Sequence, residues 1–101
     1  MKIYKFYVGT ADKDKLEQIK PDREFIACFD FWFKNYTLQE ATGRYTMQEL
    51  NTVIDEKTFI VTVIDDLADK SLKYIVSNLK QQLNQETILV TQEHLTTIKF
   101  M

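Results

Sequence analysis

Cysteine, histidine, proline and glycine are all scarce in this chain. The 101 residues include one cysteine (Cys28), one histidine (His94), one proline (Pro21) and two glycines (Gly9 and Gly43). A single cysteine excludes an intramolecular disulfide, and one cysteine with one distant histidine does not make a zinc site. Two isolated glycines exclude a glycine-rich phosphate loop. We therefore expect no metal and no cofactor, and a buried, unreactive thiol at Cys28.

Long apolar runs and an excess of positive charge are also missing. No apolar stretch is long enough to span a membrane, and the first residues lack the apolar region of a signal peptide. These features predict a cytoplasmic protein. The net charge is −2 and the lysines are scattered among acids, whereas proteins that bind duplex nucleic acid usually carry a basic stripe. Nucleic acid is therefore not an expected partner.

The chain does contain ample material for one hydrophobic core. It is 45% hydrophobic and 28% charged, which predicts a single domain over residues 1–101. Alternating apolar residues predict strands at 2–8, 36–46, 58–64 and 86–92, with "TTIKF" (96–100) either continuing the last strand or forming a fifth. Helical spacing predicts one helix from Pro21 to Tyr36 and a second that ends near Leu83.

Local signals mark the ends of these elements. Pro21 and Asp22 are typical of a helix start, with Asp22 as the capping side chain. For the second helix, the candidate caps are Asp65, Asp66 and Asp69 at its start, and Asn84 at its end. Two charged or polar stretches, 11–20 and 47–57, are interpreted as connectors, the first with a short helical turn.

The resulting element order is β-α-β-β-α-β. This order predicts an α+β fold of the ferredoxin-like type, an antiparallel sheet with two helices on one face. The uncovered face would show some of the apolar residues Ile3, Tyr7, Tyr45, Ile60 and Ile64. Because an open apolar sheet face is usually buried against a second copy, we expect a homodimer or a higher oligomer.

Two segments are candidate ligand sites. Gly43, Arg44 and Tyr45 combine close backbone approach, a planar cationic fork and an aromatic ring that stacks on a base. Gly9 lies at a strand end, and Tyr7 and Lys5 are the further ligand-binding candidates from the first strand. The favoured alternative for Gly43 is a β-bulge or close helix-on-sheet packing.

The second candidate segment is "NQET" (84–87). Gln85 and Glu86 stand where polar side chains leave a rigid scaffold, between the last helix and the last strand. The alternative is that Glu86 simply pairs with a basic residue at the turn.

Several motifs, taken in order, resemble a known family. They are "YVG" (7–9), "FDFWFKNY" (29–36), "TGRY" (42–45), "EKTFIVTVI" (56–64), "LNQETILV" (83–90) and "TIKF" (97–100). Together they resemble the family called domain of unknown function 3574, and small proteins common in bacteriophages of Gram-positive hosts. This chain departs from the family in a longer connector between Tyr45 and Glu56. The resemblance implies the fold and a phage or mobile-element source, and it brings no activity.

Three functions are consistent with these observations. The favoured hypothesis is a non-enzymatic phage protein that acts by binding, as a homo-oligomer, and engages a host protein or modulates a host defence pathway. The alternative is a binder that sequesters a nucleotide or similar anion through Arg44, Tyr45, Tyr7 and Lys5. The third is an enzyme that uses Glu86 and His94 for acid–base chemistry. In the favoured hypothesis the protein is not an enzyme.

Overall fold

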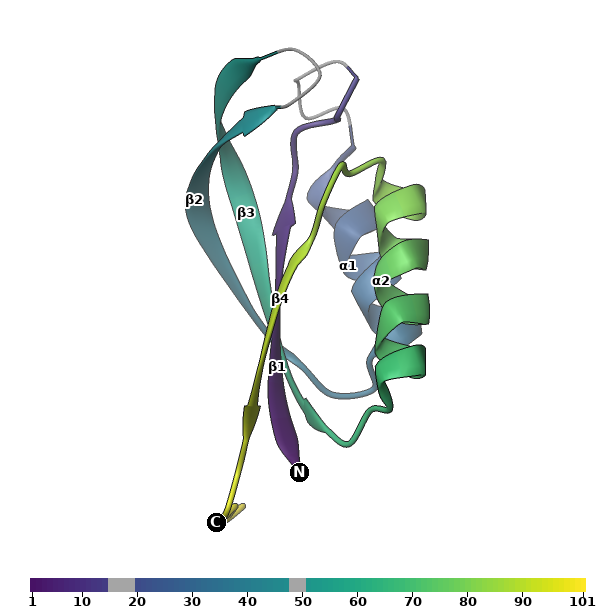
Figure 1. Ribbon diagram of the computed structural model, residues 1–101, viewed down its shortest axis with the longest axis vertical. Coiled ribbons are helices and arrows are strands. Elements are labelled where there is room, and N and C mark those ends of the chain that lie inside the picture. Colours follow the sequence, from purple (N-terminus) through teal and green to yellow (C-terminus); the bar gives the residue numbers. More distant parts are fainter. Residues whose placement is uncertain (15–19, 48–50) are drawn as a thin grey trace.

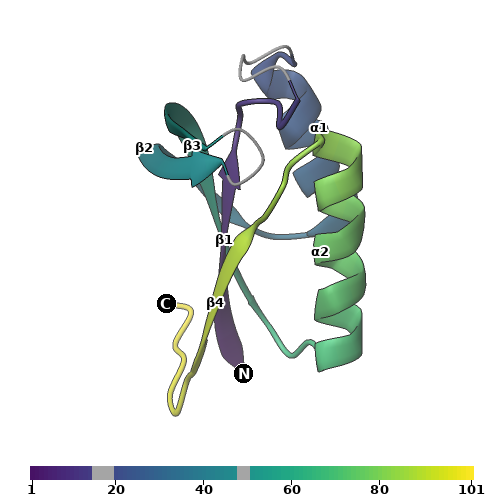
Figure 2. The ribbon, with the colours of Figure 1, turned by 45° about the horizontal axis from the view of Figure 1, so that its top comes forward.

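The computed structural model describes residues 1–14, 20–47 and 51–101 and forms two layers (Figure 1). Its elements are β1 (Lys2–Gly9), α1 (Asp22–Trp32), β2 (Thr37–Met47), β3 (Thr52–Asp65), α2 (Asp69–Leu83) and β4 (Leu89–His94). The four strands form one antiparallel sheet in the order β2-β3-β1-β4. Both helices lie on the same side of this sheet (Figures 1 and 2). The predicted ferredoxin-like α+β fold is therefore confirmed.

The core lies between the helices and the two central strands. Strand alternation sends Tyr4, Phe6 and Val8 of β1 to the helix side, where each is fully buried. The other buried apolar side chains of this core come from β3 and the helices, and include Phe25, Phe29, Phe59, Val61, Leu79 and Leu83. The other face of the sheet carries the alternate residues, and the candidate site lies there.

The β2–β3 hairpin is longer than the sequence pattern predicts. Residues 47–57 were interpreted as a connector, but β3 already begins at Thr52 and pairs with β2 in one unbroken register from Thr37↔Thr62 to Met47↔Thr52. The prediction fails because Ile54 and Glu56 are both buried on the same side of β3. A buried carboxylate at a strand position hides the apolar alternation that marks a strand. The remaining connector positions, 48–50, lie outside the described residues.

The helix starts also differ from their predicted signals. Neither helix has a side-chain cap: the N-cap residues are Pro21 and Ala68, both in extended backbone. Asp22 instead forms an ion pair with Lys57 of β3 at 2.6 Å. Asp69 is the first residue of α2, where its negative charge interacts favourably with the positive end of the helix dipole, but its side chain does not cap the helix.

Some of the predicted C-terminal ends of the elements also differ from those observed. Helix α1 stops at Trp32, so Tyr36 lies beyond it and donates a hydrogen bond to Asp30 at 2.6 Å. Asn84 does end α2 in the left-handed conformation, with φ of 49°. Residues 95–101 form neither helix nor strand, so "TTIKF" is not a fifth strand. The helical turn predicted within 11–20 falls mostly on residues outside the described part.

Two further predictions concern the reactivity of Cys28 and the presence of a membrane-spanning segment. Cys28 is half-buried against the core, and burial raises the pKa of its thiol, which agrees with an unreactive cysteine. Among the described residues, neither helix is long and apolar enough to cross a membrane.

Candidate functional site

A cavity of about 360 Å³ opens at the hairpin end of the sheet, on the face away from the helices. Its lining residues define what we call the glycine cleft: Tyr7, Gly9, Gly43, Arg44, Thr58, Thr87 and Leu89. The strand register builds this hollow, because Gly9 of β1 pairs with Thr58 of β3, and Gly43 of β2 pairs with Glu56. Two positions on the open face, one on each side of β3, therefore lack side chains.

Glycine is required at position 43 because the Thr58 side chain lies too close for a Cβ, and not because of the backbone conformation. Its φ is not positive, and a Cβ at this position would lie 2.6 Å from Thr58 Oγ1. The unbroken β2–β3 register excludes the predicted bulge at Gly43. The close packing that was the other part of that prediction does occur, but against a threonine of the neighbouring strand rather than against a helix.

Glu56 and Thr58 are the unusual polar residues at this end of the sheet. They are 7% and 8% exposed, and among the described residues Glu56 Oε1 and Thr58 Oγ1 have no hydrogen-bond partner. Buried polar atoms in folded proteins nearly always have a partner, so an unpaired atom calls for an explanation such as a ligand. Alternation places both side chains on the open face of β3. Thr58 lines the glycine cleft, whereas Glu56 pairs with Gly43 and is not one of the lining residues.

The other oxygen of Glu56 is held by the protein. Oε2 accepts a hydrogen bond from the backbone N–H of Ala11, in the segment that follows β1. Burial raises the pKa of the Glu56 carboxyl, and the backbone N–H groups of Ala11 and Thr10 offset part of that rise. The carboxyl is thus fixed through one oxygen and unpaired at the other.

Arg44 does not present a free guanidinium. Its Nε and Nη2 bind the two carboxylate oxygens of Asp55 at 2.5 and 2.9 Å. Asp55 is its cross-strand neighbour, and alternation directs both side chains to the face opposite Glu56. Arg44 borders the glycine cleft, but the fork expected to bind an anion is already engaged.

The remaining candidates of the first segment differ in position. Tyr7 lines the glycine cleft and is half-buried. Lys5 is exposed two residues away on the same face of β1, paired with Thr62 and Thr91. The backbone of Tyr45 pairs with Ile54. The predicted stacking of the Tyr45 ring on a base concerns a side chain outside the described part of the structure.

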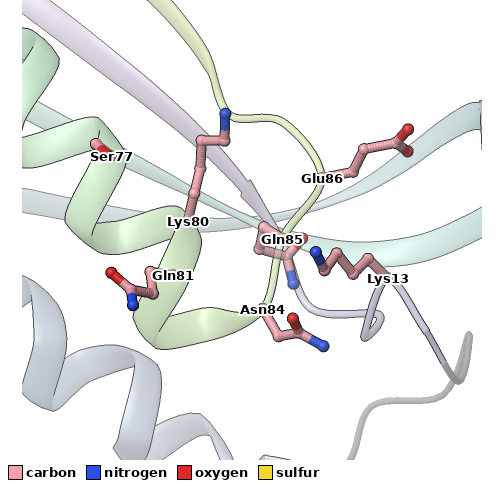
Figure 3. Close-up of a pocket in the computed structure, with 7 residues that line it drawn as sticks. All are labelled: Lys13, Ser77, Lys80, Gln81, Asn84, Gln85 and Glu86. Atoms are coloured by element: carbon pink, nitrogen blue, oxygen red, sulfur yellow. The ribbon is translucent and has the colours of Figure 1, made fainter.

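The second predicted segment borders a different hollow. A cavity of about 420 Å³ at the end of α2 is lined by Lys13, Ser77, Lys80, Gln81, Asn84, Gln85 and Glu86. Figure 3 shows that these side chains diverge, with the Glu86 carboxylate directed away from Gln81 and Asn84. Gln85 is buried at 5% exposure, and its amide donates to Ala11 O at 3.0 Å and to Leu83 O at 3.2 Å. Gln85 is thus engaged with backbone, and no ion pair or hydrogen bond joins the Glu86 carboxylate to another residue of the described ranges.

The acid–base pair of the third hypothesis does not assemble. Glu86 precedes β4, and His94 is the last residue of that strand. The first and last residues of β4 lie roughly 17 Å apart at the usual rise per strand residue, so the two side chains are at opposite ends of the strand. In the described ranges, no three His, Cys, Asp or Glu side chains gather closely enough to hold a metal ion.

Sequence reasoning missed Glu56 and Thr58 as site residues. The available signal was the period of two: Ile54, Glu56, Thr58 and Ile60 share one face of β3. An acid inserted in such a run is costly unless it has a role. Glu56 was noticed only as part of a family motif.

Two solved structures are similar to this chain. A phage SAM lyase in complex with S-methyl-5′-thioadenosine gives a TM-score of 0.70 at 19% identity, over 91% of this chain and 79% of that one. A phage SAM lyase in the apo state gives 0.63 at 20% identity, over 91% and 78%. No family model and no curated protein sequence matches the chain. The resemblance to the family of unknown function therefore stays a prediction.

This comparison corrects the favoured functional hypothesis. The favoured hypothesis was a non-enzymatic protein that acts by binding a host protein. Both similar structures are of an enzyme with this fold, so the non-enzymatic assignment is wrong. The expected link to phages agrees with the comparison, since both structures are phage proteins.

Proposed function

We propose that this protein is an enzyme that cleaves S-adenosylmethionine (SAM) and releases S-methyl-5′-thioadenosine (MTA) from the glycine cleft. The observation that carries the proposal is the buried pair Glu56 and Thr58 on the open face near Gly9 and Gly43, each with one oxygen that has no hydrogen-bond partner among the described residues. It occurs in a fold shared with a phage SAM lyase at a TM-score of 0.70. The fold alone does not define an activity, so the site is the main support.

The charge of the site suits this substrate. SAM carries a sulfonium and an ammonium group, and Glu56 contributes a carboxylate whose Oε1 has no partner in the described chain. In a site shielded from water, a carboxylate attracts a cation more strongly than it does in solvent. We assign Glu56 to the ammonium group of the amino-acid arm, and Thr58 to a hydrogen bond with the same arm.

The size and lining of the cleft also suit a nucleoside. A volume of about 360 Å³ falls in the range of small-molecule sites, which starts at roughly 300 Å³. Tyr7 offers a ring for stacking on adenine, and Leu89 an apolar contact. The glycines leave space for the ligand to approach the strands.

The bond changes balance without a cofactor. The bonding pair of the cleaved C–S bond passes to sulfur, so the sulfonium becomes the neutral thioether of MTA. The carbon fragment completes its valence by loss of a proton or by attack of its own carboxylate. Glu56 would hold the amino-acid arm in the geometry that either route requires.

The direct test is the release of MTA from SAM by purified protein, followed by chromatography and compared with SAM alone. Glu56→Gln should reduce the rate by about a hundredfold or more, as loss of one well-placed electrostatic group does in other enzymes. Glu86→Gln tests the cavity at the end of α2, and the exposed Glu93→Gln is a matched control; both should keep the wild-type rate. Absence of MTA production by the wild type would refute the proposal.

Binding measurements separate the role of Glu56 from general damage. Glu56→Gln should weaken the binding of cationic SAM by about tenfold or more, equivalent to about 1.4 kcal/mol. It should leave the affinity for neutral MTA nearly unchanged, because MTA lacks the amino-acid arm. Equal losses for both ligands would contradict the assigned role.

We also propose that the protein is phage-encoded, acts in the host cytoplasm where SAM is available, and forms a homo-oligomer through the part of the open sheet face that lies outside the glycine cleft. Support for the oligomer comes from apolar side chains on that face that do not line the cleft: Ile64 is 37% exposed, and Ile3 and Ile60 are half-buried. A partner copy would remove this surface from water.

A further inference from the structure

The backbone of Ala11 links Glu56 to Gln85, a residue of the second candidate segment (84–87). On one side, its N–H donates to Glu56 Oε2. On the other side, its carbonyl accepts a hydrogen bond from the Gln85 side chain at 3.0 Å, across 74 positions of sequence. Gln85 follows α2 and Glu56 belongs to β3, so a single residue after β1 joins the end of the helix to the sheet.

The peptide that carries the Ala11 N–H is anchored on both sides. Thr10 precedes it, and its N–H and hydroxyl both donate to Lys57 O, at 3.1 and 2.8 Å. Gln85 fixes the carbonyl that follows, and donates also to Leu83 O at 3.2 Å. Loss of the Gln85 bond would release one of the two anchors and let the N–H turn away from Glu56.

In the part of the chain that the structure describes, the charged groups around Glu56 do not supply another anchor. Asp12 accepts from Asn84, and Lys57 forms an ion pair with Asp22. Arg44, next to the cross-strand position, is bound to Asp55. The orientation of the Glu56 carboxylate therefore depends on the Ala11 N–H, with a contribution from that of Thr10.

We propose that Gln85 is a positioning residue for Glu56, acting through the backbone of Ala11, which holds Oε2 and so orients the carboxyl whose Oε1 has no partner among the described residues. We call the chain of hydrogen bonds from Gln85 through Ala11 to Glu56 the relay. The purpose of the relay rests on the proposed function, but its hydrogen bonds are present in the protein without ligand. Gln85 suits the role because its amide group has two donors and the relay uses both, one for Ala11 O and one for Leu83 O.

The relay makes a prediction of definite sign. The hydrogen bond from Ala11 stabilises the charged form of Glu56 and so lowers its pKa against the effect of burial. Gln85→Met keeps the size of the side chain but removes its donors. The pKa of Glu56 should therefore rise above its wild-type value, and the pH dependence of MTA release should move in the same direction.

The experiment is an NMR titration of the Glu56 carboxyl carbon in wild type, Gln85→Met and Asn84→Gly. Asn84→Gly is the matched control, because it removes the side-chain bonds to Asp12 and Asp14 of the same segment but leaves Gln85 and Ala11 intact. A raised Glu56 pKa in Gln85→Met alone supports the relay. An unchanged pKa in Gln85→Met, or an equal change in both variants, would overturn it.

A measurement on the wild type covers the case in which Gln85→Met does not fold. The side-chain amide protons of Gln85 and the N–H of Ala11 should both shift with the same midpoint as the Glu56 carboxyl. If the Gln85 protons do not respond, the relay is refuted. Neither titration involves SAM, so a moved Glu56 pKa without MTA production would refute the proposed function and leave the relay intact.

Discussion

At the scale of single residues, the strongest constraint is the contact between Gly43 and Thr58. Nothing in the backbone conformation demands glycine here, since φ at Gly43 is not positive. The constraint is the Thr58 hydroxyl, which occupies the space of a Cβ. A tightly packed interior resists added atoms even when the chain conformation would allow them.

Gly43→Ala should therefore destabilise the protein by roughly 1–3 kcal/mol, the usual cost of overpacking. In a Thr58→Ala background the same substitution should cost much less, because the nearest remaining atom, the Cβ at position 58, would be 3.7 Å away. Urea unfolding of the four proteins in this double-mutant cycle measures the coupling. Additive effects would show that Gly43 is constrained by something other than Thr58.

Glu56 makes stability depend on pH in a specific direction. Its pKa is raised in the folded protein above the ordinary value of 4.5, so the folded state binds its proton more tightly than the unfolded state. The contribution of this carboxyl to stability is complete below about pH 4.5 and is lost as pH rises through the folded pKa.

Glu56→Gln removes this titration. The free energy of unfolding of wild type minus that of the variant should be larger at about pH 4 than at about pH 8. The change should be about 1.4 kcal/mol for each tenfold difference between the acid constants of Glu56 in the folded and unfolded states. Urea unfolding followed by the fluorescence of Trp32, the only tryptophan, gives the difference at each pH. A difference that stays constant with pH would contradict a raised pKa.

At the scale of elements, the end of α2 combines two functions in Asn84. The residue adopts φ of 49°, which terminates the helix, and its side chain donates to Asp12 at 2.8 Å and to Asp14 at 2.9 Å. The backbone adds a bond from Lys13 N to Asn84 O at 3.1 Å. The end of α2 is thereby joined to the segment that follows β1.

Two substitutions distinguish these functions. Asn84→Gly keeps the left-handed turn but loses the side-chain bonds, and should cost about 1–2 kcal/mol. Asn84→Ala loses the bonds and also places a Cβ in the left-handed region, and should cost about 1 kcal/mol more. Thermal unfolding measures both. Equal stability of the two variants would mean that the left-handed conformation is not maintained in solution.

At the scale of the whole molecule, the open sheet face sets the expected assembly. The helices cover one face only (Figure 2), and the other carries exposed Leu89 and Ile64. Light scattering at tens of micromolar should report a mass above the monomer, and Ile64→Lys, outside the glycine cleft, should reduce it toward the monomer. Phe31→Lys, at a 72% exposed residue of α1 on the helix side, is the control and should keep the wild-type mass. A monomeric wild type would refute the oligomer.

Much of this architecture follows from the sequence by itself. The period of two in β1 and in 58–64, and the helical period up to Leu83, determine the element order and the buried face, because burial of apolar side chains dominates the choice of local structure. Asn84 also acts as its residue type predicts, since asparagine tolerates the left-handed conformation. These signals are local, and local signals are readable without a structure.

The site was decided by the tertiary structure. The pairing of Gly43 with Glu56, the engagement of Arg44 by Asp55 and the relay from Gln85 through Ala11 all join residues from different elements. Glu56 looked like part of a polar connector, and only the register of β3 shows that it is buried with an unpaired oxygen. Sequence spacing predicts which face a residue takes within one element. Which neighbours it meets, and whether its polar atoms are satisfied there, depends on how the strands align.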